Sequence, residues 1–190
     1  VAHATDWFQI IFNPSFPYRL AHMLIASMLT AAFLVLGISA WRMRKKVDGP
    51  ATAKVFKAMT VITMVLAPLQ VFVGDLHGLN TFEHQPAKVA AIEGVWETHS
   101  GVGFTLFGFP DEETRTTRFA LEIPYAASLI LTHDINGEIR GLNEFEGEHP
   151  PVAIVFWSFR VMVGVGMLMI LVAWWSGWQL FRRQQKPGTW

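Results

Sequence analysis

Residues 20–41 read LAHMLIASMLTAAFLVLGISAW and contain no Asp, Glu, Lys or Arg. About 20 apolar residues are enough for a helix to cross the roughly 30 Å hydrocarbon core of a bilayer. This stretch of 22 residues therefore predicts a membrane-spanning helix, which we place at residues 17–42. Pro17 suits the first turn of such a helix. The fold class that the stretch indicates is an all-α membrane protein.

Two further apolar stretches complete the predicted bundle. Residues 58–74 are uncharged, and the stems of the lysines before them can lengthen this stretch to a span at 56–74. Pro68 inside it should kink the helix, which is tolerable where a neighbour covers the freed carbonyl. The third span is predicted at 152–181, where Arg160 is the only charge.

Composition supports a membrane protein and excludes other classes. The 190 residues are 52% hydrophobic and 16% charged, against about 25% charged in a soluble domain. A net charge of zero with many aromatic residues excludes a basic nucleic-acid binder and a disordered tail. The absence of cysteine excludes disulfides, zinc–thiolate and iron–sulfur sites, and a cysteine nucleophile. Because the chain opens at Val1 without a signal peptide, we expect a piece of a longer polypeptide.

The distribution of charged residues predicts which side of the membrane each loop faces. Residues 42–57 hold six Lys and Arg against one acid, and three more bases follow the third span. By the positive-inside rule, the loop 43–55 and the tail 182–190 are expected to be cytoplasmic. Residues 75–149 hold 13 acids and four bases. The segment 1–16 and the loop 75–151 are therefore expected on the outer side.

The outer loop is too long for a passive connector. Apolar residues at helical spacing predict a short amphipathic helix over Pro86–His99. Gly101–Pro110 is expected to be a turn-rich aromatic stretch. Phe119–Leu131 is apolar enough to lie on the membrane surface or against the spans.

His22 and Met162 are the candidate metal ligands. Each lies in the outer half of its predicted span, at a similar depth, about 7 Å for His22 at 1.5 Å per residue. Ionisable residues within membranes are functional candidates, and one His with one Met is the axial ligand set of a six-coordinate b-type haem. A packed polar histidine and a methionine that fills the core are the alternatives.

Arg160 and Arg19 are candidate partners for haem propionates, because guanidinium binds carboxylates bidentately. Arg19 shares a helix face with His22. Residues two apart on a helix point about 200° apart, so Arg160 cannot share the centre of the face that carries Met162. The alternative for Arg160 is an interfacial side chain that reaches outward to solvent.

Lys88 and Glu93 flank an apolar turn of the predicted loop helix. A solvated surface helix would explain both residues. A quinol that gives up two electrons also loses two protons, however, and Glu93 beside an apolar aromatic site could accept one. Glu97, one helical turn further, could relay it.

Several stretches together resemble one family, subunit I of the cytochrome bd quinol oxidases. They are Phe12-Asn-Pro14, Arg19-Leu-Ala-His22, Leu36-Gly-Ile-Ser-Ala-Trp41, Lys88-Val-Ala-Ala-Ile-Glu93, Trp96-Glu-Thr98, Phe104-Thr-Leu-Phe-Gly108, Ile123-Pro-Tyr125 and Phe159-Arg-Val-Met-Val163. The run from Lys88 to Thr98 is highly specific, and the stretches follow one another through nearly the whole chain.

The resemblance implies a quinol:oxygen oxidoreductase of a bacterial inner membrane, with the large loop periplasmic. The three spans would be the fifth, sixth and seventh helices of the subunit. His22 and Met162 match the axial ligands of haem b558, and Arg160 matches the arginine beside that haem. Lys88 and Glu93 match the loop pair that acts in oxidation of membrane quinol. The loop looks like that of the short-loop, often cyanide-insensitive branch.

The resemblance further implies that a high-spin haem b, haem d and the oxygen-reducing site belong to helices outside these residues, with subunit II as partner. Two readings of other classes stay open at this point. One is a non-oxidase membrane cytochrome of the b type that relays electrons. The other is a transporter or structural subunit without haem.

Overall fold

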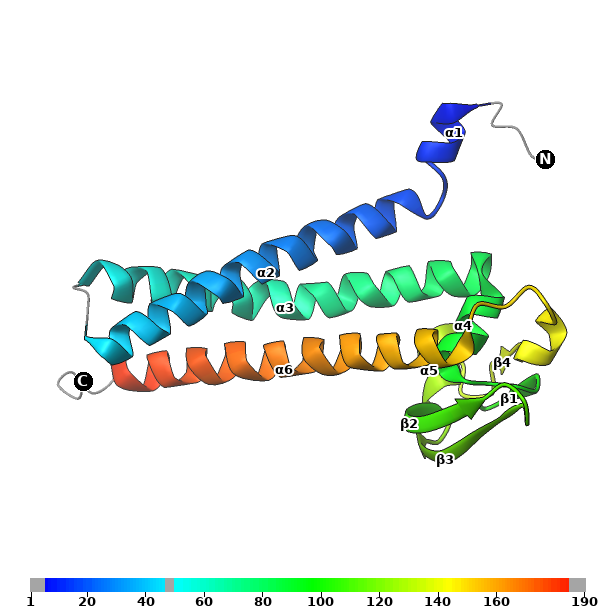
Figure 1. Ribbon diagram of the computed structural model, residues 1–190. Helices are drawn as coiled ribbons and strands as arrows, with labels where there is room; N and C mark the ends of the chain where they lie inside the picture. Colours follow the sequence, from blue (N-terminus) through cyan, green and yellow to red (C-terminus); the bar gives the residue numbers. More distant parts are fainter. Residues whose placement is uncertain (1–5, 47–49, 185–190) are drawn as a thin grey trace. The chain divides into compact units, whose positions relative to one another are not determined.

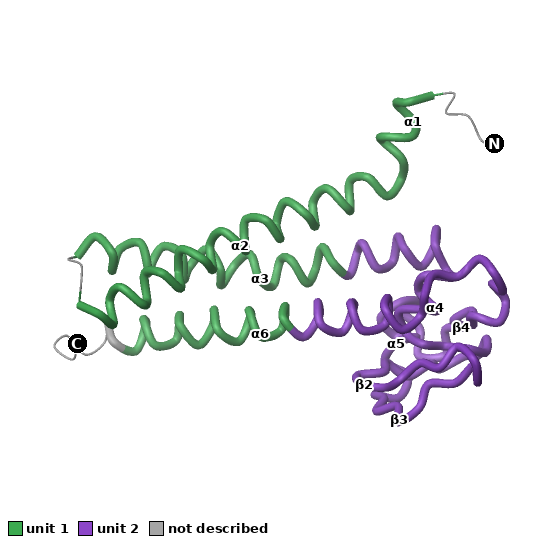
Figure 2. The backbone as a smooth tube through the Cα atoms, viewed as in Figure 1, with its two compact units in different colours: residues 1–74, 165–190 green, residues 75–164 purple. Residues whose placement is uncertain are grey.

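The computed structural model describes residues 6–46 and 50–184 and divides them between two compact units (Figures 1 and 2). The helical unit comprises residues 1–74 and 165–190, and the loop unit comprises residues 75–164. The beginning of the predicted outer segment, part of the predicted cytoplasmic loop and most of the predicted tail lie outside the described residues.

Three long helices dominate the described chain, as the sequence predicts. They are α2 (Phe16–Lys45), α3 (Pro50–His84) and α6 (Val152–Gln184), and each is long and apolar enough to cross a membrane. Pro17 lies in the first turn of α2 as expected. A short helix, α1 (Trp7–Ile11), precedes them, and the Asp6 carboxylate caps it by accepting the Phe8 N–H at 2.9 Å.

The helix α3 continues through Pro68 because its neighbour supplies the missing donor. Proline has no N–H, so the carbonyl four residues earlier, that of Met64, loses its partner within the helix. The indole N–H of Trp174 on α6 donates to this carbonyl at 3.3 Å. This bond meets the condition under which a proline is tolerated inside a spanning helix, while the kink at Pro68 stays a prediction.

The all-α expectation is wrong for the loop unit, which contains strands. The strands β2 (Phe104–Asp111) and β3 (Thr116–Ile123) form an antiparallel hairpin. The stretch that looked turn-rich is β2, because its glycine serves close packing: a Cβ at Gly108 would lie 2.8 Å from Cγ2 of Thr117 on β3. The turn forms where the Asp111 carboxylate accepts the Glu113 and Thr114 N–H groups.

Smaller elements complete the loop unit. They are α4 (Pro86–Glu93), β1 (His99–Ser100), α5 (Ala126–Thr132), β4 (Glu138–Ile139) and the 3-10 helix η1 (Leu142–Phe145), with β1 and β4 paired antiparallel. The hairpin and α5 leave several large apolar side chains exposed, Phe119 by 83%. That this stretch lies on the membrane or against the spans stays a prediction.

The loop helix α4 ends six residues earlier than the sequence suggests. Gly94 adopts φ = 71°, a left-handed conformation that L-residues with side chains disfavour, and so it ends the helix. Its N–H donates to the carbonyl of Ala90 at 2.8 Å. The residues beyond Gly94 turn back into the core, where Trp96 packs with Leu142 and Val152.

The bond between Trp174 and Met64 gives a test of the fold. We expect Trp174→Phe to lower the stability of the intact membrane protein by about 1 kcal/mol, the typical contribution of one such hydrogen bond. In a Pro68→Ala background the cost should shrink, because the new alanine supplies a backbone N–H that bonds to the Met64 carbonyl. Unfolding in detergent measures both, with Trp175→Phe as the control. Equal losses in both backgrounds would contradict the role given to Trp174.

Candidate functional site

The helix α4 places the two loop residues that the sequence singles out. Val89, Ala90 and Ala91 are buried, so this apolar face fixes α4 against the core of the loop unit. Lys88 is exposed and Glu93 is buried. Residues five apart on a helix point about 140° apart, so the two side chains lie on different faces. In the described structure Lys88 is not the cation that pairs with Glu93.

Arg160 is that cation. Its Nη2 lies 3.6 Å from Oε2 of Glu93, and the two residues are only 9% and 3% exposed. Its Nη1 donates to the backbone carbonyls of Ile92 and, at 3.1 Å, Phe156. The Phe156 ring centroid lies 3.3 Å from the guanidinium carbon, so cation–π attraction adds to the ion pair.

Burial gives Glu93 an unusual proton affinity. Loss of solvent and, more weakly, the negative charge of Glu122 raise the pKa of its carboxyl, Arg160 and the backbone of Thr105 lower it, and together these effects bring the pKa to about 7. The effect of burial on the pKa of Glu93 is therefore larger than that of the ion pair with Arg160. A group with a pKa near neutrality gains and releases a proton readily at physiological pH, as a general base must.

The pair keeps unused hydrogen-bonding capacity. Within the described residues, Nε and Nη2 of Arg160 and Oε2 of Glu93 are buried without a hydrogen-bond partner. Two free donors on one guanidinium form a fork that suits a carboxylate. Arg160 does not reach outward to solvent, and that alternative is wrong.

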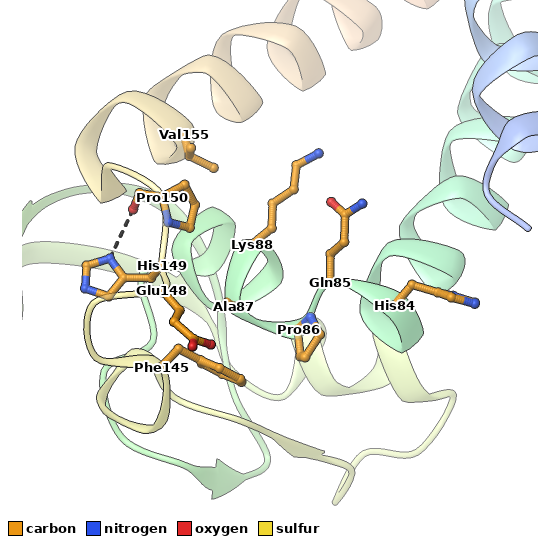
Figure 3. Close-up of a pocket in the computed structure, with 10 residues that line it drawn as sticks. All are labelled: His84, Gln85, Pro86, Ala87, Lys88, Phe145, Glu148, His149, Pro150 and Val155. Carbon is orange, nitrogen blue, oxygen red and sulfur yellow. Dashed lines mark hydrogen bonds between the residues drawn. The ribbon is translucent and has the colours of Figure 1, made fainter. Parts of the chain in front are cut away.

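A pocket of about 570 Å³ opens beside Lys88 (Figure 3). One wall is the start of α4, and the opposite wall is the segment that leads into α6. Its lining residues are His84, Gln85, Pro86, Ala87, Lys88, Phe145, Glu148, His149, Pro150 and Val155. Its volume lies within the range of ligand pockets, about 300–1,000 Å³. Glu93 is not among the lining residues.

His22 lies in the helical unit beside two residues of α3. The Gln70 amide N–H donates to Nε2 of His22 at 3.0 Å, which leaves the ring proton on Nδ1. Gly74, one turn further along α3, provides space, since a Cβ there would lie 3.2 Å from Cε1 of His22. An imidazole with an unprotonated Nε2 is the form that binds iron.

The other predicted site residues lie as follows. Arg19 is exposed on α2 in the helical unit, with His22. Met162 lies in the loop unit with Arg160, and its 51% exposure against 9% for Arg160 confirms that the two side chains point to different sides of α6. Glu97 lies beyond the end of α4, so the helical spacing that related it to Glu93 does not exist.

Sequence reasoning missed three features of these sites. It did not foresee that Glu93 and Arg160, 67 positions apart, form a pair. It did not single out Gln70 or Gly74, although a glutamine inside an apolar span is itself a signal of a polar partner. It also missed the pocket residues Glu148 and His149, which no local pattern relates to α4.

The fold and these sites define a class, an integral membrane protein with several spans and a folded loop. Comparison with known proteins gives the family. The family model described as cytochrome bd terminal oxidase subunit I matches residues 1–190. The chain belongs to this family.

Similar proteins agree with the assignment. The chain is 28% identical to cytochrome bd ubiquinol oxidase subunit 1 of Bacillus subtilis (strain 168), over 100% of the chain and 43% of the relative. It is 29% identical to a putative cytochrome bd menaquinol oxidase subunit I of the same organism, over 87% of the chain and 38% of the relative. The chain thus spans less than half the length of these relatives.

A solved structure, that of bd oxidase from Geobacillus thermodenitrificans, also matches. It is 35% identical with a TM-score of 0.80, and the match covers 88% of this chain and 39% of that one. The sequence-based identification of the subunit I family is confirmed, as are the three long apolar helices.

The pair of Glu93 and Arg160 predicts a pH-dependent loss of stability. The pKa of Glu93 is about 7 in the fold and about 4.3 in an unfolded chain, so stability falls as pH rises between these values and levels off above 7. In Arg160→Met the pKa of Glu93 in the folded protein rises further, so the stability continues to fall as the pH rises above 7. We expect the destabilisation by Arg160→Met to grow above pH 7, by up to about 1.4 kcal/mol per unit.

Hydrogen exchange of the α4 amides in the intact oxidase, corrected for intrinsic rates, measures this difference. Arg118→Met, which breaks an exposed pair with Asp111, is the matched control and should show no such growth. A destabilisation by Arg160→Met that is the same at pH 6 and pH 8 would show that Glu93 does not titrate against Arg160.

Proposed function

We propose that this chain is the haem-b-binding, quinol-oxidising part of a terminal respiratory oxidase that passes electrons from membrane quinol to oxygen and reduces it to water. The observation that carries the proposal is the arrangement around α4, with Lys88 at an open pocket and Glu93 in a buried pair. The relatives named as ubiquinol and menaquinol oxidases support it.

The setting that we propose is the inner membrane of a bacterium. The three spans lie at 17–42, 56–74 and 152–181, and the acidic loop 75–151 faces the periplasm. The positive-inside rule supports this orientation, because the short connection between the first two spans is strongly basic.

The quinol head group is proposed to bind in the pocket beside Lys88. Oxidation of one quinol breaks two O–H bonds and releases two protons and two electrons. Glu93 accepts a proton, for which a pKa of about 7 suits a carboxylate at neutral pH. The ammonium of Lys88 orients the head group. The two residues lie about 7.5 Å apart along the axis of α4, so the proton reaches Glu93 through an intervening group or water.

The residues of this chain also fit a b-type haem, which supplies a one-electron acceptor when it is bound. His22 would bind the iron through Nε2 in place of its hydrogen bond from Gln70, and Gly74 leaves space beside the ring. Met162 offers its thioether from α6. Arg160, two of whose donors have no hydrogen-bond partner within the described residues, and Arg19 would hold the propionates. This haem corresponds to b558 of the family.

The remaining cofactors and partners follow from the family. We propose that a high-spin haem b and haem d are bound by the rest of subunit I, outside these residues, and that subunit II completes the enzyme. The length of the loop favours the short-loop branch.

Removal of either axial ligand tests the haem assignment. We expect His22→Ala and Met162→Ala to abolish the low-spin b-haem bands of the intact oxidase while the spans still insert, because ligation and not hydropathy is lost. Reduced-minus-oxidised spectra measure this, and Met167→Ala, equally exposed on α6, is the control. Wild-type bands in either ligand variant would contradict the assignment.

Replacement of the loop residues tests quinol oxidation. Glu93→Gln removes the base but keeps the shape, so turnover should fall by about 10²–10⁴-fold, while dithionite still reduces the haem. In the wild type the rate should rise with pH through about 7 as Glu93 loses its proton, and Glu93→Gln should lack this rise. Lys88→Ala should mainly raise KM for quinol, since a positioning charge acts on binding.

Oxygen uptake with a soluble quinol gives these values. Glu113→Gln, in the exposed turn of the hairpin, is the control and should behave as wild type. Normal turnover in Glu93→Gln would move the role of base to another residue.

A further inference from the structure

The pocket beside Lys88 raises the question of the second proton. Glu93 can hold only one of the two protons of a quinol. Two other titratable side chains of the pocket lie on the segment that leads into α6, Glu148 and His149, and His84 lies at the far end of α3. Any outlet for the second proton must connect this pocket with solvent.

His149 is the residue that joins two cavities. Besides the pocket of about 570 Å³, it lines a second one of about 110 Å³, and no other described residue belongs to both linings. The second cavity is lined by the acids Glu112 and Glu146 and by Arg115. Arg115 and Glu146 form an ion pair whose side chains are largely exposed, so this cavity borders solvent.

The hydrogen bond of His149 fixes the state of its ring. Nδ1 lies 3.1 Å from the carbonyl oxygen of Pro150, which can only accept, so Nδ1 carries the proton of the neutral ring (Figure 3). The lone pair is therefore on Nε2, and this nitrogen is the base. Imidazole is the side chain whose ordinary pKa suits proton transfer near neutral pH.

The acids of the second cavity favour a positive charge beside it. Glu112 accepts the Val152 N–H at 2.8 Å at the start of α6, and so its carboxylate is held in place. Glu146 is paired with Arg115, and the charge of Lys88 in the larger pocket is offset by that of Glu148, so Glu112 is the carboxylate in excess. A proton that passes through His149 is therefore attracted toward the smaller cavity.

We propose that His149 is the outlet for one quinol proton. The inference rests on the proposed quinol oxidation. When an O–H bond of the head group breaks, the proton binds Nε2 of His149, and the head group gives up one electron to the acceptor that a bound b haem would supply. The imidazolium then releases this proton to water in the second cavity and is neutral for the next turnover. Glu93 takes the other proton as the head group gives up its second electron in the same way, so each quinol loses two protons and two electrons.

The experiment uses His149→Gln in the intact oxidase. Glutamine keeps a donor for the Pro150 carbonyl but cannot titrate. We expect kcat for oxygen uptake with quinol to fall by about 10²-fold, within the range for loss of an acid–base group, with KM and the haem spectrum unchanged. Free imidazole added to the assay should restore turnover, which a merely structural role would not allow.

His99→Gln is the matched control, because Nδ1 of His99 also bonds a backbone carbonyl, that of Glu97, while His99 lines neither cavity. It should keep wild-type turnover. A loss in His149→Gln that imidazole does not relieve, or an equal loss in His99→Gln, would overturn the proposal. Normal turnover in His149→Gln with impaired Glu93→Gln and Lys88→Ala would also overturn it and leave quinol oxidation standing. Normal turnover in all three would remove the proposed function itself.

A second measurement needs no variant. Carbethoxylation of the wild-type oxidase should modify His149, and a quinone analogue in the pocket should slow this reaction relative to that of the loop residue His133. Equal rates with and without the analogue would contradict a place for His149 in the pocket.

Discussion

The buried contact between Glu93 and Arg160 is the constraint on which the loop unit depends. Two charges taken out of water cost several kcal/mol each unless their geometry and hydrogen bonds compensate. Here the guanidinium reaches the carboxylate, two backbone carbonyls and the face of Phe156. Because Glu93 ends α4 and Arg160 lies in the first turns of α6, the pair fixes these two elements against each other. The pocket beside Lys88 is lined by the start of α4 and by the segment that leads into α6.

The two faces of α4 separate two chemical tasks. Its buried face places Glu93 where loss of solvent raises the pKa of the carboxyl to about 7. Its exposed face keeps Lys88 in contact with solvent, at the edge of the pocket. One residue is therefore suited to proton exchange and the other to holding a polar head group. Protonation of Glu93 also leaves the charge of Arg160 without compensation, so any acid that binds the free donors of Arg160 responds to the state of Glu93.

The sequence predicts the helices well and the loop poorly, for a physical reason. Long uncharged stretches have few alternatives to a helix in a membrane, since every backbone polar group must be paired within the segment. The sequence did not predict the hairpin, because Gly108 was interpreted as a turn residue, whereas it allows the two strands to approach closely. Gly94 likewise ended a helix that apolar spacing extended to His99. At Gly108 a tertiary contact decided what the local pattern could not, whereas the left-handed Gly94 is itself a local signal for the end of a helix.

The candidate sites likewise divide into features that the sequence predicts and features that only tertiary structure determines. Individual residues could be chosen from sequence, because Glu93, Arg160 and His22 are ionisable groups in apolar or membrane settings. Their partners could not, because a pair such as Glu93 and Arg160 exists only once α4 meets α6. The bond from Trp174 to Met64 marks the boundary between the two cases. The presence of Pro68 in the sequence predicts that one backbone carbonyl of the helix lacks its donor. Which group donates to that carbonyl depends on how α6 packs against α3. Proline therefore predicts that a partner is needed, and tertiary structure decides its identity.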